Sequence, residues 1–153
     1  MKITFKNSEK EVSKDTLFVS IDFKNKDGIV RDLSAQAGNG IKTLYLKCEE
    51  IEKMNLRKLF LLVRKMVVMA KNAKVEKLAF SFNDFVFEKI KLNNEELGEI
   101  IGSQLDFANY EFNEYKTPPK EGFNLIKEVI IVGTNKEIEK SILKGNEIVE
   151  EVN

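Results

Sequence analysis

The chain has 153 residues, of which 25 are lysine or arginine and 25 are aspartate or glutamate, so its formal net charge at pH 7 is zero. This balance gives no general electrostatic reason to bind nucleic acid or an anionic membrane surface. With 42% hydrophobic residues and two prolines, the composition indicates one globular domain over residues 1–153 and excludes a disordered or fibrous chain.

Histidine is absent and Cys48 is the only cysteine. The commonest general base, the commonest zinc ligand and the Ser-His and Cys-His nucleophile pairs are therefore excluded. A lone cysteine forms no intramolecular disulfide, which agrees with a reducing compartment. Residues 1–8 are too polar for a secretory signal and no run of roughly 18 apolar residues occurs, so we expect a cytoplasmic protein.

The first third of the chain predicts three strands. Residues 2–6 alternate weakly between apolar and polar, and residues 16–23 alternate clearly. Residues 41–48 are the third predicted strand. Between the second and third, turn signals bracket a stretch compatible with a helical turn. These signals are Asp27-Gly28 and residues 37–40.

The first predicted long helix begins after Asn55, a good N-cap residue. Its apolar positions recur at the spacing of one helical face: Leu56, Leu59, Phe60, Val63, Met66, Val67 and Ala70. Leu61, Leu62, Val68 and Met69 widen this surface well beyond one stripe. Two interpretations follow: a core helix flanking a sheet, or a helix whose surplus apolar surface meets another domain or subunit.

Residues 77–82 predict a strand. Residues 86–92 either continue this strand or begin a hairpin. A second long helix then begins at Asn93, which forms a capping box with Glu96, and it ends before Pro118-Pro119. Leu97, Ile101 and Leu105 form an apolar row in this helix.

Gly98 and Gly102 stand four residues apart in the second helix. Each costs about 1 kcal/mol relative to alanine in a helix interior. We therefore expect them to mark a close contact with a neighbouring backbone.

Residues 127–133 read as a central strand covered on both faces, because the apolar run does not alternate. Thr134 and Glu137 predict a capping box for a last helix. Its expected inner face comprises Ile138, Ile142, Gly145, Val149 and Val152. The order of elements predicts an α/β fold, a three-layer α/β/α arrangement with a mixed sheet flanked by helices.

Candidate catalytic groups all have a simpler structural explanation. The acidic clusters at residues 49–52, 94–99 and 147–151 suit solvated helix surfaces, and Asp22, Asp27 and Asp32 suit turns. Cys48 lies beside Glu49, which disfavours a thiolate. Gly38 and Gly40 lack the surrounding pattern of a phosphate loop. Tyr110, Phe112 and Tyr115 suit the anchoring of a helix end rather than base stacking.

The segment with Tyr110, Phe112, Tyr115 and Lys116 at the end of a helix, followed by a strand over residues 128–132 and a helix over residues 135–153, resembles the N-terminal domain of the leucyl aminopeptidases, peptidase family M17. In that family the final helix runs directly into the catalytic domain. The resemblance implies a macro-domain-like fold and a C-terminal peptidase domain as the partner.

The resemblance also implies two divalent metal ions, zinc or manganese, in the catalytic domain, and assembly of the full protein as a homo-oligomer, usually a hexamer. The family's metal ligands have no counterpart in this chain, so we expect no catalytic, cofactor-binding or metal-binding residue in it. The glycine-rich turn common after the third strand is replaced by residues 47–49, which weakens any inference of a ligand-cradling loop. A stand-alone macro-like module that binds a nucleotide or a protein is the alternative function, and a self-contained hydrolase is the third.

Overall fold

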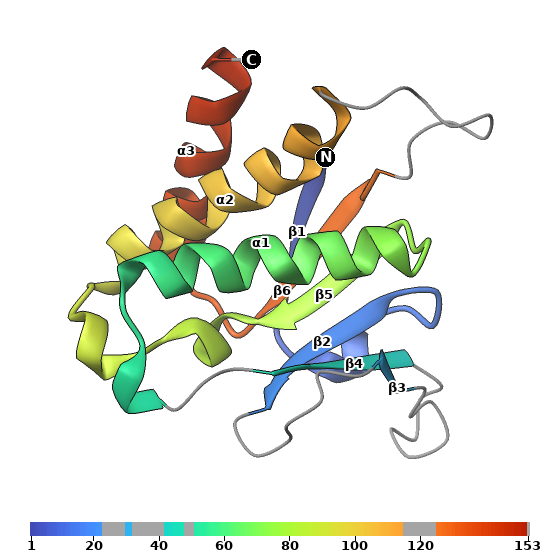
Figure 1. Ribbon diagram of the computed structural model, residues 1–153, viewed down its shortest axis with the longest axis horizontal. Helices are drawn as coiled ribbons and strands as arrows, with labels where there is room; N and C mark the ends of the chain where they lie inside the picture. The colour runs from blue at the N-terminus through green and yellow to red at the C-terminus, as the bar shows by residue number, and fades with distance from the viewer. Residues whose placement is uncertain (23–29, 32–41, 48–50, 115–124, 153) are drawn as a thin grey trace.

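The computed structural model describes residues 1–22, 30–31, 42–47, 51–114 and 125–152, which form one six-stranded sheet with helices packed against it (Figure 1). The strands are β1 (Lys2–Lys6), β2 (Leu17–Asp22), β3 (Val30–Arg31), β4 (Lys42–Lys47), β5 (Lys77–Ser81) and β6 (Glu128–Val132). They lie in the order β1-β6-β5-β2-β4-β3. The first five strands of this order run parallel, and β3 is antiparallel to β4 at the edge. The sheet is therefore mixed, as the sequence predicts.

Strand β6 lies inside the sheet, where it pairs with β1 on one side and β5 on the other. Residues Val129, Ile130, Ile131 and Val132 are all buried. Because successive side chains of a strand point to opposite faces, both faces of β6 are covered. The interpretation of its apolar run is confirmed.

Three α-helices accompany the sheet, and local capping fixes where they begin. They are α1 (Leu56–Asn72), α2 (Asn94–Glu114) and α3 (Lys136–Val152). The Asn55 side chain accepts from Lys58 N at 2.9 Å, and Asn93 and Glu96 form the predicted capping box. The predicted Thr134 cap is wrong by one residue, because Ile138 N donates to the side chain of Asn135.

Helices α1 and α2 pack on one face of the sheet, and α3 packs mainly against α2 (Figure 1). The shared core contains, among others, Val19 from β2, Phe80 from β5 and Ile131 from β6. On α1 its members include Leu59, Val63 and Met66. Most of the wide apolar surface of α1 is thus buried within the domain.

The opposite face of the sheet is covered in part by the connection from β1 to β2. This connection contains the short 3-10 helix η1 (Glu9–Glu11), after which Val12 packs with Phe18, Ala79, Ile130 and Val132. The α/β, macro-domain-like fold is confirmed. In the described part of the chain this second layer is formed by η1 and its flanking residues rather than by an α-helix.

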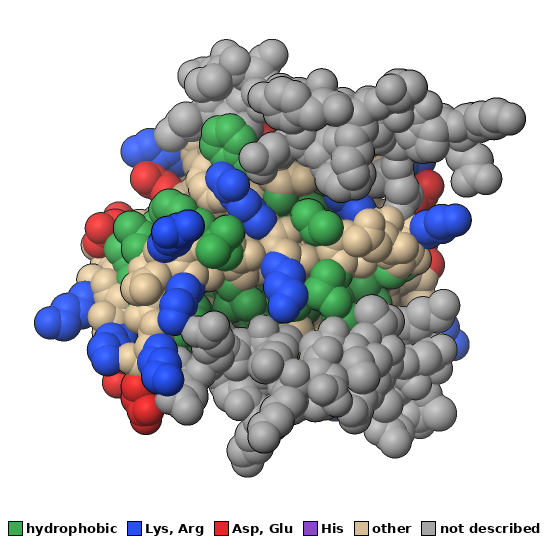
Figure 2. Space-filling model, in the orientation of Figure 1, with side chains coloured by type: hydrophobic (Ala, Val, Ile, Leu, Met, Phe, Trp, Pro, Cys, Tyr) green, Lys and Arg blue, Asp and Glu red, His purple; other side chains and the backbone are tan. Residues whose placement is uncertain are grey.

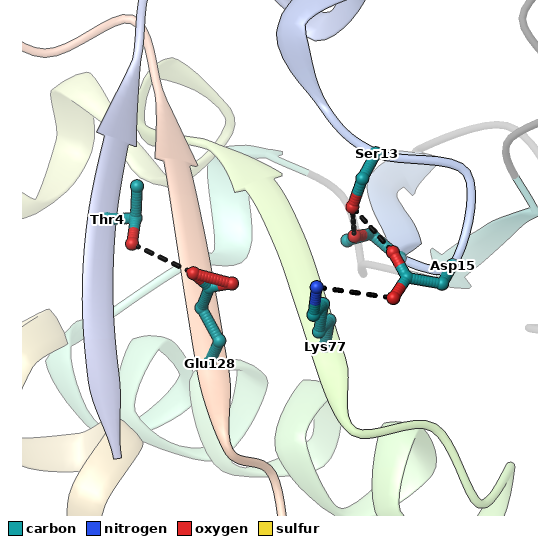
Figure 3. A network of polar contacts seen from close by, with 6 residues as sticks. Thr4, Ser13, Asp15, Lys77 and Glu128 are labelled. Carbon is teal, nitrogen blue, oxygen red and sulfur yellow. Dashed lines mark hydrogen bonds and ion pairs between the residues drawn. The ribbon is translucent and has the colours of Figure 1, made fainter.

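Polar side chains of β1, β6, β5 and the β1–β2 connection form the contacts drawn in Figure 3. Thr4 Oγ1 donates to Glu128 Oε1 at 3.1 Å across β1 and β6. Asp15 accepts from Ser13 Oγ at 2.6 Å and pairs with Lys77 Nζ at 3.2 Å. The hydroxyl of Ser13 and then Lys77 lower the pKa of the Asp15 carboxyl. The Asp15–Lys77 ion pair joins the β1–β2 connection to β5.

One sequence expectation fails in the middle of the chain, and another is largely outside the described residues. Residues 86–92 form neither a strand continuation nor a hairpin, because 3-10 turns at Phe82–Phe85 and Glu88–Ile90 replace extended backbone. Val30–Arg31 forms the short edge strand β3 within the stretch that the sequence makes compatible with a helical turn. The remainder of that stretch lies outside the described residues.

Close backbone packing joins α2 to α3. A Cβ atom added to Gly102 would lie 2.0 Å from the Ile142 carbonyl oxygen, and one added to Gly98 would lie 2.9 Å from Ser141 Cβ. From the other side, a Cβ at Gly145 would lie 2.1 Å from the carbonyl oxygen of Glu99. The expected role of the α2 glycines is confirmed, and their partner is α3.

Candidate functional site

Neighbouring strands β2 and β5 form a topological switch point in the sheet. After β2 the chain continues to β3 and β4 on one side, whereas after β5 it continues to β6 on the other. In open parallel sheets, such divergence leaves a place for ligands outside the carboxyl ends of the two strands. This edge is therefore the first candidate for a binding site.

Asp84 lies at this edge, in the 3-10 turn that follows β5. Its Oδ2 accepts from the backbone N of Ile21 at 3.4 Å, so the side chain spans the ends of β5 and β2. Burial raises the pKa of the Asp84 carboxyl, the hydrogen bond from Ile21 opposes this rise, and the charge of Glu9 adds to it. A half-buried carboxyl with a raised pKa at a strand end is a typical ligand-facing group.

Gly133 follows β6 at the same edge with φ of 82°, a conformation that glycine adopts without strain. A Cβ at this position would lie 3.7 Å from Asn83 Nδ2 and 3.9 Å from Ser81 Oγ. An amide, a hydroxyl and a carboxyl thus gather near the ends of β5 and β6. The group offers hydrogen bonds for recognition of a polar ligand.

A second polar group is buried between α1, α2 and the start of β6. Lys71 is only 6% exposed, and its Nζ donates to the carbonyl oxygen of Asn109 at 2.7 Å. Burial lowers the pKa of this ammonium group. Asp106 is fully buried one turn before Asn109. Because these groups lie within the core, we interpret them as structural.

The sequence analysis singled out other residues, and the structure describes few of their side chains. Glu52 and Glu95 are exposed, Glu96 caps α2, and Glu99 pairs with Lys144 at 3.2 Å. These placements agree with a structural role. Side chains outside the described set include Asp22, Cys48, Glu49, Glu50, Tyr110, Phe112, Tyr115, Lys116, Glu150 and Glu151. Gly38 and Gly40 lie outside it as well.

Among the described residues, no cluster of three or more His, Cys, Asp or Glu side chains could hold a metal ion. Within the same residues, none of the helices is long and apolar enough to cross a membrane. Asp84 was not among the residues predicted from the sequence. The available signal was a polar pair, Asn83 and Asp84, one residue after an apolar strand.

The outer surface of the helices is a further candidate, for contact with a macromolecule. Large apolar side chains remain exposed on all three α-helices: Leu56 is 43% exposed, Leu61 52%, Phe107 37% and Leu143 42%. Figure 2 shows hydrophobic side chains among Lys and Arg side chains over α1, with Asp and Glu toward the margins of this view. The surplus apolar surface of α1 is therefore partly solvent-exposed at Leu56 and Leu61.

No protein-family model matches the chain, and no curated protein matches its sequence. Solved structures do share its fold. A tomato leucine aminopeptidase mutant superposes with a TM-score of 0.66 at 12% identity, over 99% of this chain and 36% of the aminopeptidase chain. The macro domain of ganglioside induced differentiation associated protein 2 superposes with a TM-score of 0.54 at 12% identity, over 94% of this chain and 81% of that chain.

These likenesses define the class of the protein as a macro-domain-like α/β domain. At 12% identity they bear on the fold and not on the activity. The chain spans 36% of the aminopeptidase that it resembles.

Proposed function

We propose that this chain is a non-catalytic domain of the kind that precedes the peptidase domain in M17 leucyl aminopeptidases. The observation that carries the proposal is the superposition of 99% of the chain on little more than a third, 36%, of a leucine aminopeptidase. The helix-strand-helix order around the Tyr110 to Lys116 segment supports the same assignment, because α2, β6 and α3 occur in that order.

In this proposal the domain contributes to assembly and to the shape of the entrance to the peptidase active site. The partner is the C-terminal peptidase domain of the same protein, which would hold two divalent metal ions, zinc or manganese, and release N-terminal amino acids from peptides. The full protein would be a cytoplasmic homo-oligomer, a hexamer. The exposed apolar side chains of the helices support a role in contact rather than in chemistry.

The reading frame that encodes the chain tests this proposal. The frame is expected to continue past Asn153 into a peptidase domain, and a stop codon at that point would contradict the proposal. Removal of residues 1–153 from the full product is expected to change its sedimentation coefficient and its KM for long peptides. An unchanged oligomer and an unchanged KM would argue against a role in assembly or access.

A macro-like binding module is the second candidate. This function is favoured because the chain matches 81% of the length of a macro-domain chain. Asp84, Asn83 and Ser81 at the carboxyl ends of the strands would contact a nucleotide ligand. Titration calorimetry with ADP-ribose tests this function, with Asn83→Ala as the variant expected to weaken binding. The absence of heat at millimolar ADP-ribose would count against a nucleotide ligand.

A further inference from the structure

Helices α1 and α2 present a surface that is both apolar and basic. We define the α1–α2 face by the exposed residues Arg57, Leu61, Lys65 and Phe107 and the partly buried residues Arg64, Val68 and Ile100. Leu61 is 52% exposed and Phe107 is 37% exposed. Large apolar side chains placed beside charged ones on a folded surface are typical of a protein contact site.

The α1–α2 face spans the seam between the two helices. Arg64 Nε donates to Gln104 Oε1 at 2.7 Å across the seam between the two helices. Residues three or four positions apart share one side of a helix. Leu61 and Val68 therefore flank Arg64 on α1, and Ile100 and Phe107 flank Gln104 on α2.

The charge of this face is positive. Helix α1 carries Arg57, Lys58, Arg64, Lys65 and Lys71 and no acidic residue. Lys71 is buried, Lys58 Nζ donates to the carbonyl oxygen of Lys53 at 3.2 Å, and Arg64 is bonded to Gln104, so Arg57 and Lys65 are the exposed cations of the face.

Of the described carboxylates of α2, Glu95 is exposed in the first turn of the helix, and the other three have partners or are buried. Glu96 accepts from Asn93 N in the cap, and Glu99 pairs with Lys144 of α3 at 3.2 Å. Asp106 is buried. A partner for this face therefore needs carboxylates as well as apolar side chains.

We propose that the α1–α2 face binds an acidic amphipathic helix of a partner protein. A third helix laid over the seam would place its apolar stripe on Leu61, Val68 and Phe107, as helices do in bundles and in helix-in-groove recognition. Carboxylates beside that stripe would pair with Arg57 and Lys65. The assignment goes beyond the aminopeptidase proposal and does not depend on it.

Charge distinguishes this partner from a second copy of the chain. A two-fold contact brings the same patch of each copy together, which would oppose the arginines and Lys65 of one copy with those of the other. A lipid bilayer is a less suitable partner, because α1 has too little exposed apolar area to bind one. The main apolar side of α1, with Leu59, Val63 and Met66, is already in the core, and an interfacial helix needs that side for the membrane.

The test is fluorescence anisotropy with a labelled synthetic peptide of about 15 residues, four helical turns, that carries leucine on one side and glutamate on the other. Binding is expected in low salt and should weaken as salt is added, because exposed ion pairs are screened. The same peptide with lysine in place of glutamate should not bind. Amide resonances of Leu61, Arg64 and Phe107 should shift when the acidic peptide is added.

Substitutions test the electrostatic part and the apolar part of the contact separately. Arg57→Glu with Lys65→Glu should weaken binding about tenfold or more, since two attractive pairs become repulsive. Leu61→Ser should weaken binding without changing the salt dependence. Lys140→Glu, an exposed charge reversal on α3, is the matched control and should bind as the wild type does.

Five results would overturn the proposal. These are no binding of the acidic peptide at millimolar concentration, equal binding of the lysine peptide, and affinity unaffected by the charge reversals. The fourth is preferential binding to phosphatidylserine vesicles over the acidic peptide, which would assign the face to a membrane. A dimer that dissociates on Leu61→Ser would contradict the assignment in favour of a second copy.

Discussion

Asn109 and Ile126 are joined by two hydrogen bonds between the side chain of the first and the backbone of the second. Ile126 N donates to Asn109 Oδ1 at 3.0 Å, and Asn109 Nδ2 donates to the Ile126 carbonyl oxygen at 3.0 Å. Both residues are buried, at 2% exposure each. The Asn109 amide thus bonds to the N–H and the carbonyl oxygen of Ile126, as the backbone of a neighbouring strand would. These bonds connect α2 to the segment just before β6.

Replacement of Asn109 should therefore destabilise the domain strongly. Asn109→Leu leaves the N–H and the carbonyl oxygen of Ile126 buried without these partners, at a cost of about 1–3 kcal/mol for each group. We expect a total loss of about 2–6 kcal/mol in urea denaturation. Asn94→Ala, at an exposed position of α2, is the control and should change stability by about 0.5 kcal/mol or less. Equal stability of both variants would contradict the role of this contact.

The α2–α3 contact makes a second prediction, at Gly102. Because a Cβ there would lie 2.0 Å from the carbonyl oxygen of Ile142, Gly102→Ala should force the helices apart. Overpacking costs about 1–3 kcal/mol, more than the gain of about 1 kcal/mol in helix propensity. Thermal unfolding should show a lower Tm for Gly102→Ala than for Gly98→Ala, whose Cβ would meet a side-chain atom at 2.9 Å. A higher Tm for Gly102→Ala than for the wild type would show that the helices are not so close.

Lys71 predicts a pH dependence at alkaline pH. Burial lowers its pKa in the folded protein, so the unfolded chain binds more protons between that lowered pKa and the ordinary lysine value of about 10.4. Stability should therefore rise with pH through this window. Lys71→Met removes the titrating group and should flatten this rise in urea melts at a series of pH values. Parallel curves for the two proteins would contradict the assignment.

Asp84 predicts the opposite trend at acidic pH. Its pKa is raised by burial, so the folded protein binds more protons than the unfolded chain between about pH 4 and the raised pKa. Stability from this group falls as pH rises through that window. Asp84→Asn should be more stable than the wild type at neutral pH, and the difference should vanish at low pH. Asp15→Asn is the comparison, because the lowered pKa of Asp15 predicts a loss of stability at neutral pH.

Local signals predicted much of the fold. The N-caps at Asn55 and Asn93 were recognisable because the capping side chain and its backbone donor are three residues apart. Two glycines in α2 predicted a close contact because no other reason for them exists in a helix. The identity of the partner, α3, was not predictable, because it depends on how β6 places the last helix.

Features fixed by distant residues could not be predicted. Asp84 becomes a candidate site residue only because β2, more than sixty positions earlier, ends beside it and supplies the N–H of Ile21. The 3-10 turns around it replaced the expected strand because Phe82 and Phe85 both enter the core. At the last helix, either Thr134 or Asn135 could cap, and Asn135 is the residue whose side chain accepts the bond from Ile138 N.

Hydrolysis of leucine p-nitroanilide in the presence of Mn²⁺ tests the central claim most directly, when measured on the whole gene product and on the isolated residues 1–153. A non-catalytic aminopeptidase domain predicts turnover by the whole product and none by the isolated chain. Turnover by the isolated chain, or a whole gene product without metal-dependent peptidase activity, would contradict it.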